Sequence, residues 1–163
     1  MQVALGGTFD PVHDGHLAQF ERAFTLGAVT VGLTTDSLAP ETRHTDRHVR
    51  SFAEREADLR DELRPLADRF DRAFEIRPLA EPTGIAVEPQ FDALVVSPET
   101  IEGAERINEL RVEAGHDPLS IEVVDHVPAD DGKRISSTRI VNGEIDRHGN
   151  LTPERSGRTR RRS

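Results

Sequence analysis

The chain has 163 residues, no cysteine and a formal net charge of −9. This length fits one domain with a real core, and the lack of cysteine excludes disulfides and thiolate metal sites. No apolar run is long enough to span a bilayer, no signal peptide precedes the first strand, and an acidic chain disfavours duplex nucleic acid as a partner, so we expect a cytoplasmic protein without membrane or nucleic-acid binding.

The stretch from Val3 to His16 reads as a strand, a glycine turn and the start of a helix. The glycine pair ending at Gly7 stands where the backbone must turn tightly or approach a ligand closely. His13 and His16 fall at the helix start, where unpaired N–H groups and the helix dipole favour phosphate. With the hydroxyl of Thr8 beside them, these imidazoles predict a phosphate-binding site.

Strand and helix patterns alternate along the rest of the chain. Apolar runs predict strands at 28–33, 73–79, 92–96 and 119–126, and helical spacing predicts helices at 17–24, 52–70, about 100–114 and from 135. Ser51 and Glu54 form a capping box for the second helix, in which Pro65 is expected to cause a break or a kink. This alternation predicts an α/β protein with a single-domain, Rossmann-like, doubly wound fold around a five-stranded parallel sheet.

The segment Ile135–Arg139, with the sequence ISSTR, precedes the last predicted helix. By itself it favours a structural role, because Ser-Ser-Thr before a helix is a common N-cap. Together with GGTFD and HDGH, however, it resembles the nucleotidyltransferase superfamily with the HxGH and ISSTxI signatures. That resemblance implies transfer of a nucleotidyl group from a nucleoside triphosphate to a phosphate-bearing acceptor.

The middle of the chain resembles one family of this superfamily. The segments VSPET at 96–100 and RINELR at 106–111 are similar to the archaeal and eukaryotic type of phosphopantetheine adenylyltransferase. The resemblance implies that ATP and 4'-phosphopantetheine give dephospho-coenzyme A and pyrophosphate, without indicating an oligomeric state. Nicotinate or nicotinamide mononucleotide adenylyltransferase, or another HxGH nucleotidyltransferase, is the alternative enzyme. The non-enzyme alternative is a catalytically silent nucleotide-sensing module.

The resemblance also implies which residues act. It implies that His16, His13 and Thr8 are catalytic. Residues implied to bind ATP are Gly7, Thr8, Phe9, His13, Gly15, His16, Ser136, Ser137, Thr138 and Arg139. Residues implied to bind the acceptor are Thr8, Thr35, Arg47 and Arg111, although solvated roles for the two arginines are as well supported. Mg²⁺ is expected to bind mainly through ATP phosphates, so no protein ligand for a metal is named.

Charge is distributed unevenly along the chain. We expect a nucleotidyltransferase domain over residues 1–146 and a polar, basic tail without packed structure over 147–163. The last ten residues hold five arginines and one glutamate, so the preceding residues carry −13, the difference between −9 and +4. Such self-repulsion is tolerable where salt screens it, which favours a halophilic archaeon; a codon bias towards arginine is the alternative.

Overall fold

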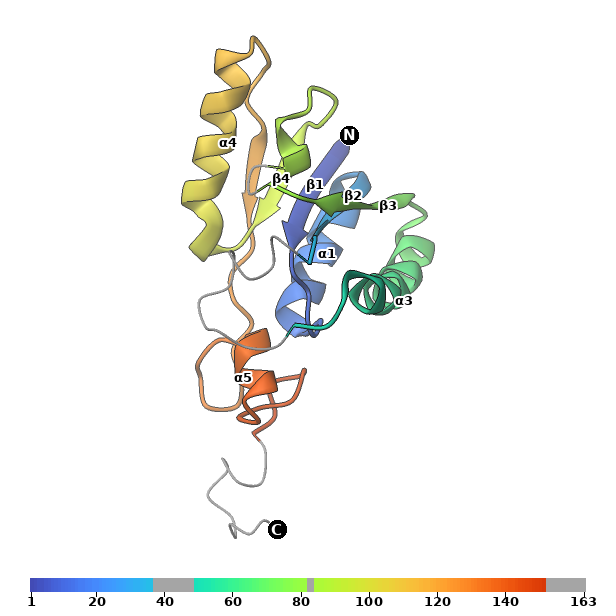
Figure 1. Cartoon of the computed structure of the whole chain (residues 1–163), viewed down its shortest axis with the longest axis vertical. Helices are drawn as coiled ribbons and strands as arrows, with labels where there is room; N and C mark the ends of the chain where they lie inside the picture. Colours follow the sequence, from blue (N-terminus) through green and yellow to red (C-terminus); the bar gives the residue numbers. More distant parts are fainter. Residues whose placement is uncertain (37–48, 82–83, 152–163) are drawn as a thin grey trace, which may run out of the picture.

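A computed structural model describes residues 1–36, 49–81 and 84–151 (Figure 1). Five strands form one sheet in the order β3-β2-β1-β4-β5, and every pairing is parallel. The strands are β1 (Gln2–Gly7), β2 (Ala28–Thr34), β3 (Phe74–Leu79), β4 (Ala93–Val96) and β5 (Ser120–Val123). The predicted α/β class and five-stranded parallel sheet are confirmed.

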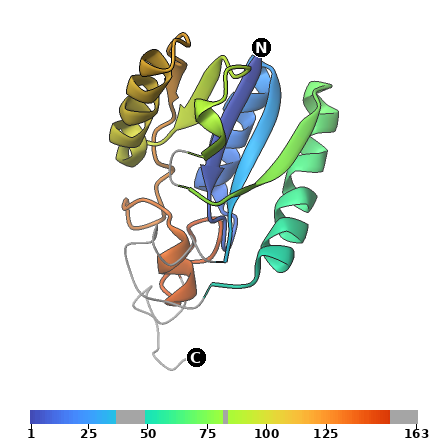
Figure 2. The same cartoon turned by 45° about the horizontal axis from the view of Figure 1, so that its top comes forward.

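Helices lie on both faces of the sheet (Figure 2). The α-helices are α1 (Asp14–Leu26), α3 (Phe52–Phe70), α4 (Ile101–Glu113) and α5 (Ser137–Val141), and the short 3₁₀ helices are η1 (Gly84–Val87) and η2 (Pro98–Thr100). The predicted capping box of Ser51 and Glu54 is present at the start of α3. That helix continues through Pro65 rather than breaking there. Pro65 and Asp61, whose carbonyl loses its helical donor, are both exposed, so water can replace the missing bond.

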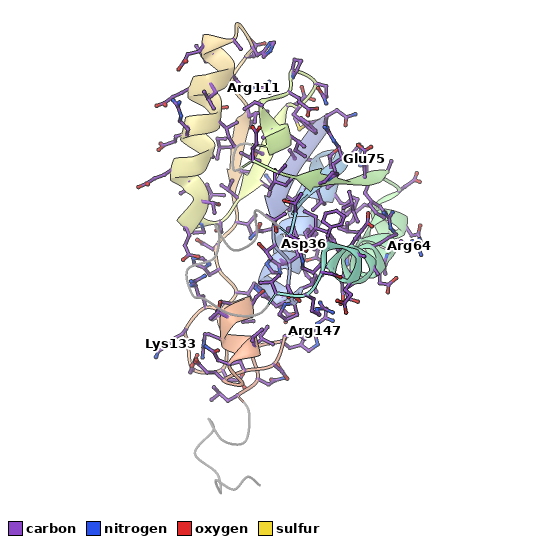
Figure 3. All side chains as sticks on the ribbon, in the orientation of Figure 1. Asp36, Arg64, Glu75, Arg111, Lys133 and Arg147 are labelled. Carbon is purple, nitrogen blue, oxygen red and sulfur yellow. The ribbon has the colours of Figure 1, made fainter. Side chains whose placement is uncertain are left out.

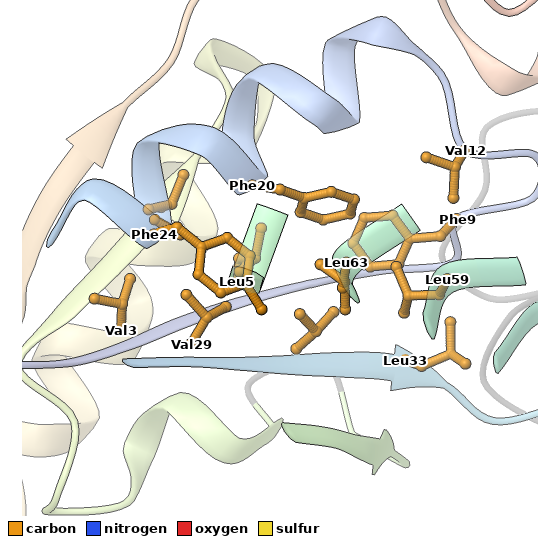
Figure 4. Close-up of a cluster of buried hydrophobic side chains, with 14 of the residues drawn as sticks. Val3, Leu5, Phe9, Val12, Phe20, Phe24, Val29, Leu33, Leu59 and Leu63 are labelled. Atoms are coloured by element: carbon orange, nitrogen blue, oxygen red, sulfur yellow. The ribbon is translucent and has the colours of Figure 1, made fainter. Parts of the chain in front are cut away.

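The larger hydrophobic core lies between the sheet and the helices α1 and α3 (Figure 4). Alternate residues of β1 and β2 point into it, as expected for strands with two buried faces. Fully buried members include Val3, Leu5, Val31, Phe20, Phe24, Leu59 and Leu63. The opposite face of β1 and β4 packs on η1 and α4. Burial of such side chains stabilises the fold by about 1.5–3 kcal/mol each.

The carboxyl ends of β1, β2 and β4 meet at one edge of the sheet, where the strand order changes direction between β1 and β4. Ligands of open α/β sheets bind at this kind of switch point. After β5 the chain passes beyond the same edge, and α5 lies there (Figure 1). A small cluster of Ala129, Ile135 and Ile145 holds this last part of the chain together.

The expected boundary of the tail at Arg147 needs correction. The Arg147 carbonyl accepts a bond from the Asp14 amide, its guanidinium contacts Glu62 at 2.8 Å, and the His148 ring contacts the Asp14 carboxylate at 3.0 Å. Leu151 also forms a β-bridge with Ile145. The packed part therefore extends to Leu151, because polar side chains that form ion pairs with the body order this segment. The rest of the predicted tail lies outside the described residues.

Candidate active site

His13 and His16 are held by hydrogen bonds at the start of α1. The His13 Nδ1 accepts from the Gly15 amide at 3.0 Å, so His13 is the N-cap of the helix. The His16 Nδ1 accepts from the His13 amide at 3.2 Å, which completes a capping box made by two histidines. The two rings stack with their centroids 3.8 Å apart. One motif thus caps the helix and fixes both imidazoles.

These bonds also fix the protonation of the rings. An amide N–H can only donate, so each Nδ1 carries no hydrogen and each neutral ring bears its hydrogen on Nε2. Burial, reinforced by Arg134 and Arg147 and opposed by Asp14, lowers the pKa of His13 to about 4. Burial and the neighbouring His13 lower the pKa of His16 well below its ordinary value. Both rings are therefore neutral Nε2–H donors at physiological pH, suited to an anionic ligand.

Tight packing around the turn explains other residues of the first motif. A Cβ on Gly15 would lie 2.8 Å from the His13 ring, so only glycine fits beneath it. Phe9 is a non-glycine residue in the left-handed region, with φ of 50°. The centroid of its buried ring lies 4.8 Å from that of His16, in an edge-on contact, and 5.4 Å from that of Phe20. These contacts hold the costly backbone conformation in place.

The ISST segment comes to the same place from the other end of the chain. Ser136 caps α5 by accepting from the Arg139 amide at 3.2 Å, and the Ser137 hydroxyl donates to the Pro11 carbonyl at 2.8 Å. The second bond ties the serine motif directly to the turn that precedes His13. The structure therefore brings the first and the last sequence motif together.

Two adjoining cavities open at this edge of the sheet. One, the polar cavity of about 370 Å³, is lined by many polar side chains and includes eight of the predicted site residues: Thr8, Phe9, His13, Gly15, His16, Ser136, Ser137 and Thr138. The other, of about 400 Å³, extends over the face of the sheet and is lined mainly by apolar residues of β1, β4, η1 and α4. Thr8, Phe9 and His16 line both cavities, and Gly7 lines the apolar one. The arrangement suits a ligand with a phosphate at the junction and an uncharged part extending from it.

An ion pair lies at the wall of the polar cavity. Arg134 donates to Glu99 at 2.6 Å, and both residues line the cavity. Because Arg134 comes from the segment before α5 and Glu99 from η2, the pair joins the two sides. Neither the 96–100 motif nor the serine motif predicted this contact.

Among the described residues, three that were predicted to bind a ligand line neither cavity: Arg139, Thr35 and Arg111. Arg139 turns its guanidinium to Asp131, Glu144 and the Arg134 carbonyl, so carboxylates of its own segment occupy it instead of a triphosphate. Thr35 donates its amide to Leu79 at 3.0 Å, while the preceding Thr34 lines the apolar cavity. A one-residue shift along a strand changes the face on which a side chain lies. Arg47 lies outside the described residues.

Arg111, expected at the acceptor, stands at the opposite edge of the sheet (Figure 3). It is 3 % exposed and donates to the carbonyls of Ala86, Glu88, Phe91 and Asp117. Asn108 of the same motif exchanges two bonds with the backbone of Leu119. The Asn-x-x-Arg pattern is thus a structural device that fixes the loops before β4 and β5, and this corrects the expected phosphate contact.

Two positions next to the cavities were not predicted as site residues. Thr34 bonds Thr8 at 3.1 Å, and the fully buried Arg55 bonds both of these threonines. Thr34 ends a buried strand at the ligand edge, so the strand register would have identified it. Arg55 lies, like Arg47, in the region where the family resemblance implies a basic residue, but a solvated role was at least as well supported on a helix rich in arginine, so its burial was not predicted.

Asp10, at the end of the GGTFD segment, binds a residue 40 positions away along the chain. Its carboxylate is 5 % exposed and accepts from the Arg50 amide at 2.8 Å and the Arg50 Nε at 2.7 Å. It therefore anchors the segment that enters α3. Within the described ranges, no group of three or more His, Cys, Asp or Glu side chains is arranged to hold a metal ion. No helix in those ranges is long and apolar enough to cross a membrane.

Comparison with known proteins gives the same class of protein as the fold and the site. The family model described as Cytidylyltransferase-like matches residues 4–143, nearly the whole described chain. A parallel sheet with a histidine-capped helix and a serine motif at its switch point thus defines a nucleotidyltransferase of this class.

Curated relatives narrow the class further. A phosphopantetheine adenylyltransferase of Methanosarcina acetivorans is 42% identical over 156 residues, covering 94% of this chain and 97% of the relative. A phosphopantetheine adenylyltransferase of Archaeoglobus fulgidus is 42% identical over 153 residues, covering 93% of this chain and 99% of the relative. The chain belongs to the archaeal-type phosphopantetheine adenylyltransferase family, as the middle motifs indicated. A crystal structure of a protein of unknown function from Archaeoglobus fulgidus has the same fold, with a TM-score of 0.66 and 33% identity, covering 83% of this chain and all of the other.

Proposed function

We propose that this enzyme transfers the adenylyl group of ATP to 4'-phosphopantetheine and releases dephospho-coenzyme A and pyrophosphate. The observation that carries the proposal is the pair of neutral Nε2–H imidazoles at the start of α1, joined to the ISST segment and facing the polar cavity. Membership of the phosphopantetheine adenylyltransferase family supports the choice of substrates.

In the proposed reaction, an oxygen of the acceptor phosphate attacks the α-phosphorus of ATP in line. The bond from that phosphorus to the bridging oxygen breaks, and pyrophosphate leaves with the electron pair. The acceptor phosphate is already an anion at neutral pH, so no general base and no covalent intermediate are needed. Catalysis then consists of positioning and of stabilising charge on the α-phosphoryl group.

Each motif has a part in this scheme. His16 and His13 donate from Nε2 to ATP phosphate oxygens, and Thr8 orients the attacking phosphate from the junction of the two cavities. Ser136 and Thr138 bind the triphosphate through their hydroxyls. Ser137, whose hydroxyl donates to the Pro11 carbonyl, binds it through its backbone amide at the start of α5. These hydroxyls, amides and neutral imidazoles are suited to donate to phosphate oxygens. A Mg²⁺ ion would be held mainly through the ATP phosphates and would neutralise part of their charge.

The apolar cavity supports the choice of acceptor. Pantetheine is a long, uncharged amide chain, and residues such as Ile85, Leu94 and Ile107 offer apolar walls beside the junction. Nicotinate mononucleotide carries a ring that favours aromatic stacking, and the chain has neither tryptophan nor tyrosine.

A pyrophosphate-release assay with a panel of acceptors tests the proposal. The kcat/KM for 4'-phosphopantetheine should exceed that for nicotinate or nicotinamide mononucleotide at least roughly tenfold, or about 1.4 kcal/mol in transition-state binding. Equal or reversed preference would refute the acceptor assignment. Nucleotide binding with no turnover of any acceptor would support the silent nucleotide-sensing module instead.

A further inference from the structure

Arg55 is an arginine with no solvent exposure, in the first turn of α3. It lines neither cavity, so the reaction scheme above gives it no role. A buried guanidinium is tolerated only where its donors are satisfied, and removing such a charge from water is costly. The side chain must therefore be explained by what it binds.

The donors of Arg55 connect three segments that meet at the edge of the sheet where the two cavities open. Nε donates to the Arg50 carbonyl at 2.8 Å, and Nη2 contacts the Asp36 carboxylate at 3.2 Å. Nη1 donates at 3.2 Å to two acceptors, the Thr8 carbonyl and the Thr34 Oγ1. Arg55 thus joins the entry to α3, the end of β2 and the glycine turn.

The bond to Thr34 determines the direction of the next one. A guanidinium can only donate, so the Thr34 oxygen accepts from Arg55 and directs its own hydrogen to the Thr8 Oγ1 at 3.1 Å. A cationic donor polarises the hydroxyl that it binds and makes that hydroxyl a stronger donor in turn. The Thr8 hydroxyl, as the acceptor in this bond, directs its hydrogen away from Thr34.

We propose that Thr34 and Arg55 are positioning residues for the transfer reaction, which hold the Thr8 hydroxyl and carbonyl through a chain of hydrogen bonds from Arg55 to Thr34 to Thr8. The proposal rests on the role given above to Thr8 at the acceptor phosphate. The chain fixes the orientation of Thr8 before the substrate arrives, so no reorganisation is needed during the transfer.

Thr34→Val tests the chain because it removes the hydroxyl while keeping the shape of the side chain. The expected result is a roughly tenfold lower kcat with the KM for ATP within about twofold of the original. Thr34→Ser, which restores the hydroxyl, should recover most of kcat. Thr30→Val is the matched control, because Thr30 lies on the same strand and is 6 % exposed against 2 % for Thr34. It should leave kcat unchanged.

A double-mutant cycle separates positioning from general stability. If Thr34 acts through the Thr8 hydroxyl, Thr34→Val should lower kcat by less than about twofold when Thr8 is already valine. A further tenfold loss in that background would overturn the proposal, as would unchanged kcat for Thr34→Val or no recovery with Thr34→Ser. An original enzyme that released no pyrophosphate would refute the proposed function itself, whereas an active enzyme insensitive to Thr34→Val would refute this inference alone.

Discussion

His13 uses one ring nitrogen to cap α1, and this determines what the other nitrogen can do. Because Nδ1 accepts from the Gly15 amide, protonating the ring at that position would break the cap. Burial of the ring is the main cause of the low His13 pKa of about 4, so the ring stays unprotonated and the cap stays intact at neutral pH. The histidine therefore affects folding in addition to its proposed part in phosphate binding, and both effects can be measured.

Substituting His13 by Asn should change how stability depends on pH. Asparagine also caps helices but does not titrate. Below its ordinary pKa of 6.5, His13 binds a proton in the unfolded chain that the folded chain does not accept until about pH 4. Unfolding is therefore favoured as the pH falls through this window, and the substitution removes that effect.

Urea unfolding at about pH 7.5 and about pH 5 checks this sign. Between the higher and the lower pH, the free energy of unfolding of the Asn variant should rise by about 2 kcal/mol relative to that of the original protein. The carboxylates titrate in both proteins, so their contribution cancels in the difference. Parallel pH dependence of the two proteins would contradict the assigned protonation of His13.

His16→Ala should slow the chemical step more than it weakens ATP binding. The bond from Nε2 strengthens as charge builds on the α-phosphoryl group, so kcat should fall on the order of 10²–10³-fold. His16→Gln is the control, since a glutamine at N3 also bonds the N-cap amide and preserves the capping box. Steady-state kinetics would exclude this role if His16→Ala kept its turnover and lost only ATP affinity.

At the scale of elements, the two polar residues of the α4 motif, Asn108 and Arg111, line neither cavity. They tie α4 to the loops that lead into β4 and β5. Both strands have their carboxyl ends at the edge of the sheet where the cavities open, so these two residues act on the site through the position of the sheet.

Arg111→Met should therefore destabilise the protein and leave catalysis by the folded fraction unchanged. Four carbonyls lose their donor, two of them in buried bonds, which costs on the order of 3 kcal/mol. Asn108→Ala is a milder variant that should act in the same direction. Thermal melts and the KM for the acceptor are the measurements, and a raised KM at unchanged stability would restore the phosphate contact expected from the sequence.

Periodicity predicted the sheet and its helices, because these depend on local patterns, and the resemblance to the HxGH superfamily implied that the HxGH and ISST motifs meet. The directions of arginine side chains could not be predicted in the same way. Arg55, Arg111 and Arg139 all donate to hydroxyls, carbonyls or carboxylates that only the folded chain brings near. Spacing along a helix indicates the face of such a residue but not which distant carbonyl or carboxylate binds it.

At the scale of the whole molecule, the charge balance leads to a test in salt. The residues before the basic end carry −13, the difference between −9 and +4. The ion pairs of the described residues are mostly at the surface, where each contributes about 0–1 kcal/mol and weakens in salt. In salt, screening of the repulsion among the excess negative charges should stabilise the protein more than the weakening of these ion pairs destabilises it.

The melting temperature should accordingly rise as KCl is increased from low to molar concentration. An uncharged solute such as sucrose at equal osmolality is the control, because it does not screen charge. A melting temperature that stays flat or falls in KCl would leave codon bias as the explanation for the abundant arginine.

The bond between Ser137 and Pro11 joins residues 126 positions apart in the chain. During synthesis the amino-terminal strand and the histidine turn leave the ribosome first, at about 5–20 residues per second. The ISST segment, and the Arg147 carbonyl that the Asp14 amide binds, emerge much later. A nascent chain consequently cannot close the proposed triphosphate site until nearly all of its described residues have been made, so nucleotide binding at that site would report that the two distant segments have come together.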